Sequence, residues 1–84
     1  MNYRIVWKPE AEKRLTTIWL DAADRQAVTD AASMIDLRLS HDPKTQGEER
    51  DAGRRILFVP PLGVIFKVNS RTRTVQVVTV WQYA

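Results

Sequence analysis

The sequence predicts one α+β domain, in which an N-terminal strand and an antiparallel helical hairpin precede a three-stranded antiparallel meander (β-α-α-β-β-β). Two observations support this fold class. Apolar residues recur with a helical period between residues 9 and 40, and three β-branched runs separated by short turns fill the last third of the chain. A chain of 84 residues without cysteine can form one modest core, so we expect residues 1–84 to be a single domain.

The first half of the chain predicts one strand and two helices. Residues 3–7 are rich in β-branched and aromatic side chains, which favours a strand that Pro9 ends. A helix is expected over about residues 9–22, and Asp24 is a good N-cap for a second helix that ends near Ser40. The two apolar stripes consist of Ala11, Leu15, Ile18, Trp19 and Ala22 in the first helix and Ala27, Val28, Ala31, Ala32, Ile35 and Leu39 in the second.

The second half predicts a loop and then three strands. Residues 42–53 are polar, contain two glycines and a proline, and show no period, which indicates a loop. Strands are expected over residues 55–59, 62–69 and 74–81, with Pro60-Pro61 in the first turn because proline cannot continue a ladder. Consecutive strands with short connections form an antiparallel meander, and the helical hairpin would cover one of its faces. The position of the first strand in the sheet is left open.

Alternation along residues 62–69 separates two faces of the sheet. Val64, Phe66 and Val68 would face the helices, and Lys67 would lie on the opposite, helix-free face. A neighbouring strand would bring either Arg54 or Arg55 to that face, and the unknown register leaves the choice between them open.

Charge is distributed unevenly between the two parts of the chain. Residues 1–49 hold seven basic and nine acidic side chains, whereas residues 50–84 hold six basic side chains and one acid, Asp51. This asymmetry favours a polyanionic or acidic protein partner for the C-terminal part. The alternative is a solvated sheet face without a partner.

The residue inventory excludes most kinds of catalytic site. With no cysteine and one histidine, His41, a metal site of the His/Cys type cannot form, and the isolated glycines do not make a phosphate-binding loop, so we expect neither metal nor cofactor. RNA cleavage by an adjacent 2′-hydroxyl remains feasible, because it needs only positioned charge and a proton-transfer group. Candidates for a nuclease site, an acidic-partner patch or a solvated face are Arg54, Arg55, Lys67, Arg73 and Tyr83.

Several short motifs give the chain a family resemblance. They are Trp7-Lys8-Pro9-Glu10-Ala11, Asp42-Pro43 before Gly47, Gly53-Arg54-Arg55, and Val64-Ile65-Phe66-Lys67-Val68. Together with the order and length of the elements, they resemble the RelE/ParE superfamily, the toxins of type II toxin-antitoxin modules. The resemblance implies a microbial RNase-like fold of four antiparallel strands with a helical hairpin. It also implies growth inhibition, a role in plasmid stabilization, and a cognate antitoxin that forms a hetero-oligomer with the toxin.

Two kinds of target follow from this resemblance. RelE-like members are mRNA interferases, which cleave mRNA on the ribosome without metal. On that pattern Arg54, Arg55 and Lys67 would stabilise charge and Tyr83 would take part in proton transfer. ParE-like members instead inhibit DNA gyrase without cleaving RNA. Further contacts to nucleic acid or antitoxin are expected from Lys44, Arg50, Arg71, Arg73 and Gln82.

The chain departs from the nuclease pattern at two positions. The arginine that related nucleases often carry at the start of the third strand falls at Leu62-Gly63, and the last strand ends in Trp81-Gln82-Tyr83. Three alternatives therefore stay open: an RNase, a gyrase inhibitor or inactive homologue that binds only its antitoxin, and a small homodimer without toxicity. No apolar run is long enough to span a bilayer and no signal peptide is visible, so a cytoplasmic protein is expected.

Overall fold

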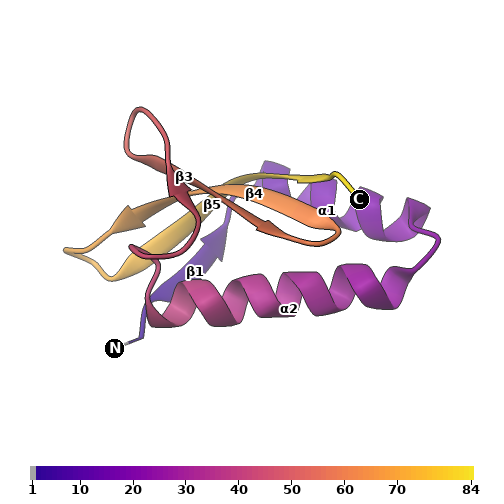
Figure 1. Ribbon diagram of the computed structural model, residues 1–84, viewed down its shortest axis with the longest axis horizontal. Helices are drawn as coiled ribbons and strands as arrows, with labels where there is room; N and C mark the ends of the chain where they lie inside the picture. The colour runs from indigo at the N-terminus through magenta and orange to yellow at the C-terminus, as the bar shows by residue number, and fades with distance from the viewer. Residues whose placement is uncertain (1) are drawn as a thin grey trace.

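Five strands form one mixed sheet, and two helices cover one of its faces (Figure 1). The computed structural model describes residues 2–84, and none of the helices within that range is long and apolar enough to cross a membrane. The predicted α+β class, with its helical hairpin and antiparallel meander, is confirmed. The elements are β1 (Arg4–Trp7), α1 (Pro9–Asp21), α2 (Arg25–His41), β2 (Glu48–Glu49), β3 (Arg54–Val59), β4 (Leu62–Asn69) and β5 (Thr74–Gln82).

Two features of the sheet differ from the sequence prediction. The strand order is β1-β5-β4-β3-β2, and β1 pairs in parallel with β5, so the sheet is not wholly antiparallel as the family resemblance implied. A parallel pair needs a long connection, and here the helical hairpin and the strands β2 to β4 all lie between β1 and β5 in the chain. The predicted loop also contains a short strand, β2, in which Glu48 pairs with Ile56 and Glu49 with Arg55.

Local sequence explains where the helices begin and end. Pro9 opens α1 at a position where its missing N–H costs nothing, and the Oδ1 atom of Asp24 accepts the N–H of Ala27 at 3.0 Å to cap α2. The guanidinium of Arg25 then donates from Nε and Nη2 to the carbonyl oxygens of Trp19 and Leu20, at 3.2 and 2.9 Å. These bonds satisfy the last carbonyls of α1 and hold the hairpin closed.

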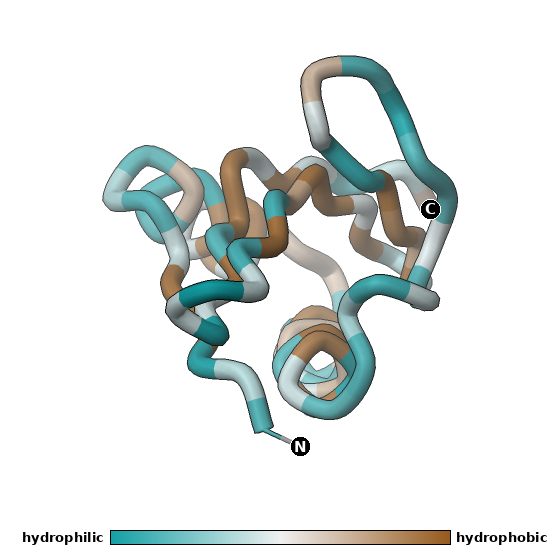
Figure 2. The backbone as a smooth tube through the Cα atoms, turned by 90° about the vertical axis from the view of Figure 1, so that its left-hand side faces the viewer, coloured by the Kyte–Doolittle hydropathy of each residue, from teal (hydrophilic) through white to brown (hydrophobic). Residues whose placement is uncertain are grey.

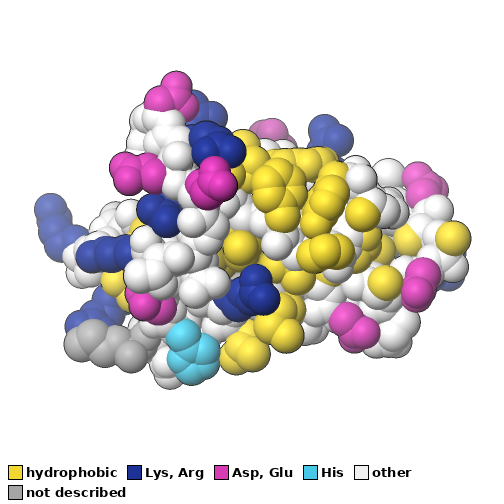
Figure 3. All heavy atoms as spheres, in the orientation of Figure 1, with side chains coloured by type: hydrophobic (Ala, Val, Ile, Leu, Met, Phe, Trp, Pro, Cys, Tyr) yellow, Lys and Arg dark blue, Asp and Glu magenta, His cyan; other side chains and the backbone are white. Residues whose placement is uncertain are grey.

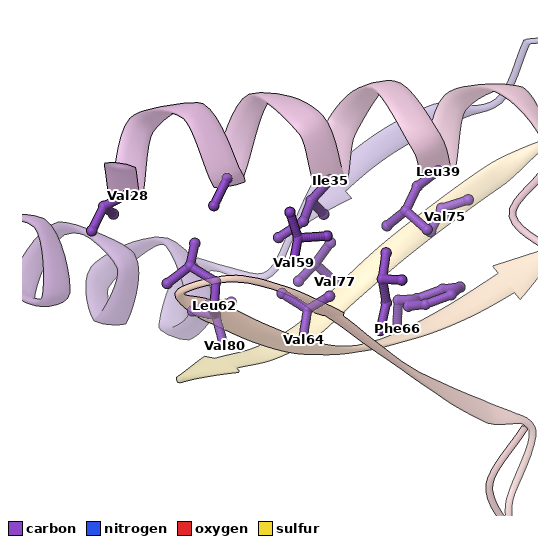
Figure 4. Close-up of a cluster of buried hydrophobic side chains, with 13 residues drawn as sticks. Val28, Ile35, Leu39, Val59, Leu62, Val64, Phe66, Val75, Val77 and Val80 are labelled. Carbon is purple, nitrogen blue, oxygen red and sulfur yellow. The ribbon is translucent and has the colours of Figure 1, made fainter. Parts of the chain in front are cut away.

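The core lies between α2, α1 and the covered face of the sheet (Figure 4). Val64 and Phe66 of β4 are fully buried there, as the alternation predicted, and Val28, Ile35 and Leu39 reach them from α2. Hydrophobic residues follow the inner strands in Figure 2, where the connecting loops are hydrophilic. The sheet therefore presents one face to the core and leaves the other without a covering element.

A bulge in β5 allows a valine-rich strand to keep one face in the core. Ile65 pairs with Thr79 whereas Phe66 pairs with Val77, so β5 contains one extra residue at this point. The extra residue shifts the alternation by one position, because a bulge sets two residues against one. As a result Val75, Val77 and Val80 are all fully buried against the helices.

Candidate functional site: the open face of the sheet

The face of the sheet opposite the helices is the candidate site, and we call it the open face. Residues directly opposite each other in neighbouring strands share a face, so the register assigns its members. They are Arg4 and Val6 of β1, Arg54, Ile56 and Phe58 of β3, Gly63, Ile65, Lys67 and Asn69 of β4, and Thr74, Gln76, Thr79 and Trp81 of β5. Basic side chains gather near the β4–β5 turn and hydrophobic ones over the β3–β4 hairpin (Figure 3).

Two cations lie opposite each other at one end of the open face. Arg54 of β3 pairs in register with Lys67 of β4, and both side chains are exposed. Among residues 2–84 the one ion pair joins Arg50 to Glu48 at 3.3 Å, so neither Arg54 nor Lys67 has a carboxylate partner there. Like charges directly opposite each other destabilise a sheet. The pair is therefore suited to an anion supplied from outside the chain.

Arg55 lies on the other side of the strand, which resolves the choice that the sequence left open. Its Nε donates to the carbonyl oxygen of Gln46 at 3.0 Å, and its Nη2 donates to that of Gly47 at 3.3 Å. The half-buried guanidinium thus ties the segment before β2 to β3. The structure brings Arg54 and Lys67 together on the open face and places Arg55 away from them.

The five residues expected to contact nucleic acid or antitoxin are dispersed over the surface. Lys44 lines a shallow hollow with Arg55 on the side away from the open face, and Arg50 is paired with Glu48 on β2. Gln82 lies at the end of β5 and donates to the carbonyl oxygen of Ala84. Arg71 and Arg73 lie in the β4–β5 turn, close to the basic end of the open face.

β2 alters the charge asymmetry that the sequence suggested. Glu48 and Glu49 belong to the acidic part of the chain, yet they pair beside β3 in the basic part. Because Glu48 is bound to Arg50, this pair is neutral overall and leaves Arg54 without a partner. Within residues 2–84, the cations of the C-terminal part that form no ion pair are therefore Arg54 and Lys67 on the open face, Arg71 and Arg73 in the β4–β5 turn, and Arg55 on the other side of β3.

Aromatic side chains occupy the other end of the open face. Phe58 contacts Trp81 and Tyr83 edge to face, with ring centroids 5.9 and 5.0 Å apart. Tyr83 is attached to the β3–β4 turn, because its N–H donates to the carbonyl oxygen of Pro61 at 2.9 Å. Phe58 and Tyr83 are each 46% exposed, so this cluster presents ring surface to solvent.

The indole of Trp81 lies over Gly63 and leaves no room for a side chain at that position. A Cβ atom at Gly63 would come within 2.7 Å of the Trp81 ring atoms Cε2 and Cζ2. This position, where the family resemblance would lead one to expect an arginine, is therefore closed to any side chain while the indole keeps its place.

We expect Gly63→Ala to destabilise the fold by about 1–2 kcal/mol, because the added methyl forces the indole to move. Trp81→Ala removes the obstacle, so Gly63→Ala in that background should be neutral or stabilising, since glycine weakens a strand. Urea unfolding of the two single variants and the double variant measures this coupling. Equal costs of Gly63→Ala in both backgrounds would show that the indole does not exclude a side chain there.

The two ends of the open face are separated along β4. Gly63, which lies below the aromatic cluster, is four residue steps from Lys67 on β4, and at ~3.3 Å per step their Cα atoms are roughly 13 Å apart. Arg54 and Lys67 can stabilise negative charge, whereas the ring of Tyr83 packs against Phe58 at the other end of the face. The open face therefore offers charge at one end and ring surface at the other.

Sequence reasoning did not bring Arg4, Phe58 and Trp81 to this face. Arg4, Phe58 and Trp81 reach it only because of strand order and register, which no local pattern reveals. The charge of Arg4 was visible, but the position of β1 was not.

Comparison with solved structures identifies the fold. The RelBE2 toxin-antitoxin complex of Mycobacterium tuberculosis matches with a TM-score of 0.78 and 14% identity, covering 98% of this chain and 99% of that one. A mutant of the E. coli toxin RelE in the free state matches at 0.75 and 12% identity, over 98% and 84%. The chromosomal ParDE system of P. aeruginosa matches at 0.68 and 15% identity, over 98% and 97%.

These likenesses extend over almost the whole chain, from β1 to the end of β5. No protein-family model matches the sequence, and no curated protein matches it. At 12–15% identity the solved structures establish the fold. Function has to be argued from the open face, since one fold can serve different activities.

Proposed function

We propose that this chain, which has the fold of the RelE and ParE toxins, is the toxin of a type II toxin-antitoxin module. Its open face would act on ribosome-bound mRNA, and a cognate antitoxin would neutralise it by binding the toxin in a hetero-oligomer. The proposal is supported by the likeness to RelBE2, RelE and ParDE structures over nearly the full chain.

The opposed cations Arg54 and Lys67 are the observation that favours an RNA target. A sheet that sets two like charges against each other without a carboxylate gains stability when an anion binds between them. The sugar-phosphate backbone supplies such anions, and phosphate contacts dominate the affinity of proteins for nucleic acids. In a nuclease these side chains would stabilise the negative charge that develops on the scissile phosphate.

Controlled expression tests the toxin assignment. We expect expression of the chain in bacteria to arrest growth within a few generations, and co-expression of a neighbouring reading frame with an acidic, disorder-prone tail to restore it. Mapping of RNA 5′ ends during the arrest should then reveal cleavage within translated codons. Normal growth at full expression would contradict the toxin assignment, and arrest with intact transcripts would contradict the nuclease.

A non-nucleolytic toxin is the second candidate function, and one observation favours it. The ring of Tyr83 packs against Phe58, which pairs with Gly63, and Gly63 lies roughly 13 Å from Lys67 along β4. The proton-transfer group expected from the sequence is therefore at the other end of the face from the opposed cations. A ParE-like inhibitor of DNA gyrase would use the same open face for binding alone. Loss of supercoiling by purified gyrase at stoichiometric amounts of this protein, with transcripts intact, would establish this candidate instead.

A further inference from the structure

A hollow at the basic end of the open face extends the site beyond the two opposed cations. It is lined by residues from three strands and the β4–β5 turn, and its volume is about 490 Å³. The residues that line it are Arg4, Lys67, Val68, Asn69, Thr72, Thr74 and Gln76. Two of these are cations, four are polar and uncharged, and no carboxylate is found in this lining.

Two polar side chains of the hollow are bonded to the β4–β5 turn, and one of them, Thr74, donates from Oγ1 to the carbonyl oxygen of Thr72 at 3.3 Å. The Oδ1 atom of Asn69 already accepts the N–H groups of Arg71 and Thr72, at 3.1 and 3.2 Å. Its amide nitrogen remains as a donor, and the same two bonds fix the turn that forms one wall of the hollow. With Asn69 Oδ1 engaged, the charged groups and the free side-chain amide hydrogens all favour an anion.

Arg4 and Lys67 can reach one ligand from opposite sides. Arg4 pairs with Thr74 and Lys67 with Gln76, so the two cations are separated by two strand spacings and two residues along the strands. That arrangement sets their Cα atoms about 12 Å apart. Both side chains are long and exposed, and together they span this distance over Thr74 and Gln76.

The start of β1 is held in place independently of its side chain. The N–H of Arg4 donates to the carbonyl oxygen of Arg73 at 2.9 Å, and that of Tyr3 donates to Ser40 at 2.7 Å. Among residues 2–84 Arg4 forms no ion pair. Its guanidinium is therefore free to bind a ligand, and its planar fork matches the oxygens of a phosphate.

We propose that this hollow binds a phosphate group and that Arg4 is a ligand-binding residue alongside Lys67. The inference deepens the proposed function, because the phosphate would belong to a polynucleotide whose neighbouring phosphate meets Arg54. A phosphate monoester or inorganic phosphate has the same chemistry and is the other source. The basic end of the open face then contacts its target through three cations from three strands.

The test is a binding measurement on the purified full chain, which does not depend on toxicity. Inorganic phosphate, adenosine monophosphate, a short single-stranded uridine oligonucleotide and a poly-glutamate peptide are titrated into ¹⁵N-labelled protein. The amides of Thr72, Thr74 and Gln76 should shift most, and the oligonucleotide should bind more tightly than the monophosphate. Arg4→Gln should weaken oligonucleotide binding about fivefold, as for an exposed ion pair.

Salt dependence separates a direct phosphate contact from a general loss of charge. For single strands each neutralised phosphate contributes about 0.7 to the slope of log affinity against log salt, so Arg4→Gln should lower the slope by about 0.7. Arg14→Gln on the exposed surface of α1 removes the same charge away from the hollow and should leave the slope unchanged.

Three results would overturn the inference. The first is an equal loss of oligonucleotide affinity in Arg4→Gln and Arg14→Gln, and the second is amide shifts outside the hollow. The third is poly-glutamate that binds in the hollow as tightly as the oligonucleotide and loses as much affinity in Arg4→Gln. Monophosphate and oligonucleotide of equal affinity would keep the phosphate site and identify the small ligand as its source. A chain that binds in the hollow but does not arrest growth would contradict the proposed function alone.

Discussion

Replacing Arg54 and Lys67 together with glutamine is expected to abolish growth arrest and to leave the folded protein at least as stable as the wild type. The two cations lie opposite each other on the exposed sheet surface, and within residues 2–84 neither forms an ion pair with a carboxylate. Removing them relieves repulsion between like charges. The midpoint of thermal unfolding should therefore stay constant or rise slightly, as expected when a site trades stability for function.

The expected loss of function is large because both groups would act on the same negative charge. Removing one electrostatic donor from a reaction centre typically lowers the rate by about 10²–10³. A single-turnover cleavage assay with programmed ribosomes should show at least this loss in the double variant. If the protein is instead a gyrase inhibitor, the same variant should lose inhibition of supercoiling.

A matched control is available on α1. Lys13→Gln with Arg14→Gln removes the same two residue types from an exposed helix surface away from the open face. This control variant should arrest growth like the wild type. Both double variants should still bind an antitoxin that also covers surfaces outside the open face. Equal loss of toxicity in the two double variants would show that net charge, and not the open face, determines function.

The fold was predictable from local patterns wherever one face of an element is buried. Asp24, Pro9 and the apolar stripes located the helices to within a residue, and alternation placed Val64 and Phe66 in the core. The strand order was not predictable in this way. β1 joins β5 through a parallel pairing over four residues, and nothing in those residues specifies the partner. β2 has only two residues, too few to show an alternation.

The candidate site was predictable in residue type and only partly in position. Lys67 was expected on the helix-free face with either Arg54 or Arg55 beside it, and Arg54 lies opposite Lys67 there. The role of Arg55 depends on backbone carbonyls of a loop that shows no sequence period. Arg4 joins the site through strand order. Tertiary pairing, which local patterns do not encode, therefore decides which cations act together.

The largest expected loss of stability follows Phe66→Ala. Phe66 is fully buried between β3, β5 and the helices, and truncation of such a side chain typically costs 3–5 kcal/mol, of which the cavity is one part, so we expect about 4 kcal/mol here. A domain of this length has a total stability of roughly 4–13 kcal/mol. The variant should therefore be partly or fully unfolded at 37 °C, which circular dichroism and urea unfolding can measure.

Phe58→Ala is the matched control, because it removes the same side chain from the neighbouring strand on the opposite face. Phe58 is 46% exposed and contacts Trp81 and Tyr83 edge to face, so its loss should cost about 1 kcal/mol and leave the protein folded. The contrast tests the assignment of faces directly, since a shift of one residue in register would exchange the two environments. Similar costs for both variants would mean that the open face is covered, and the site would then have to be sought elsewhere.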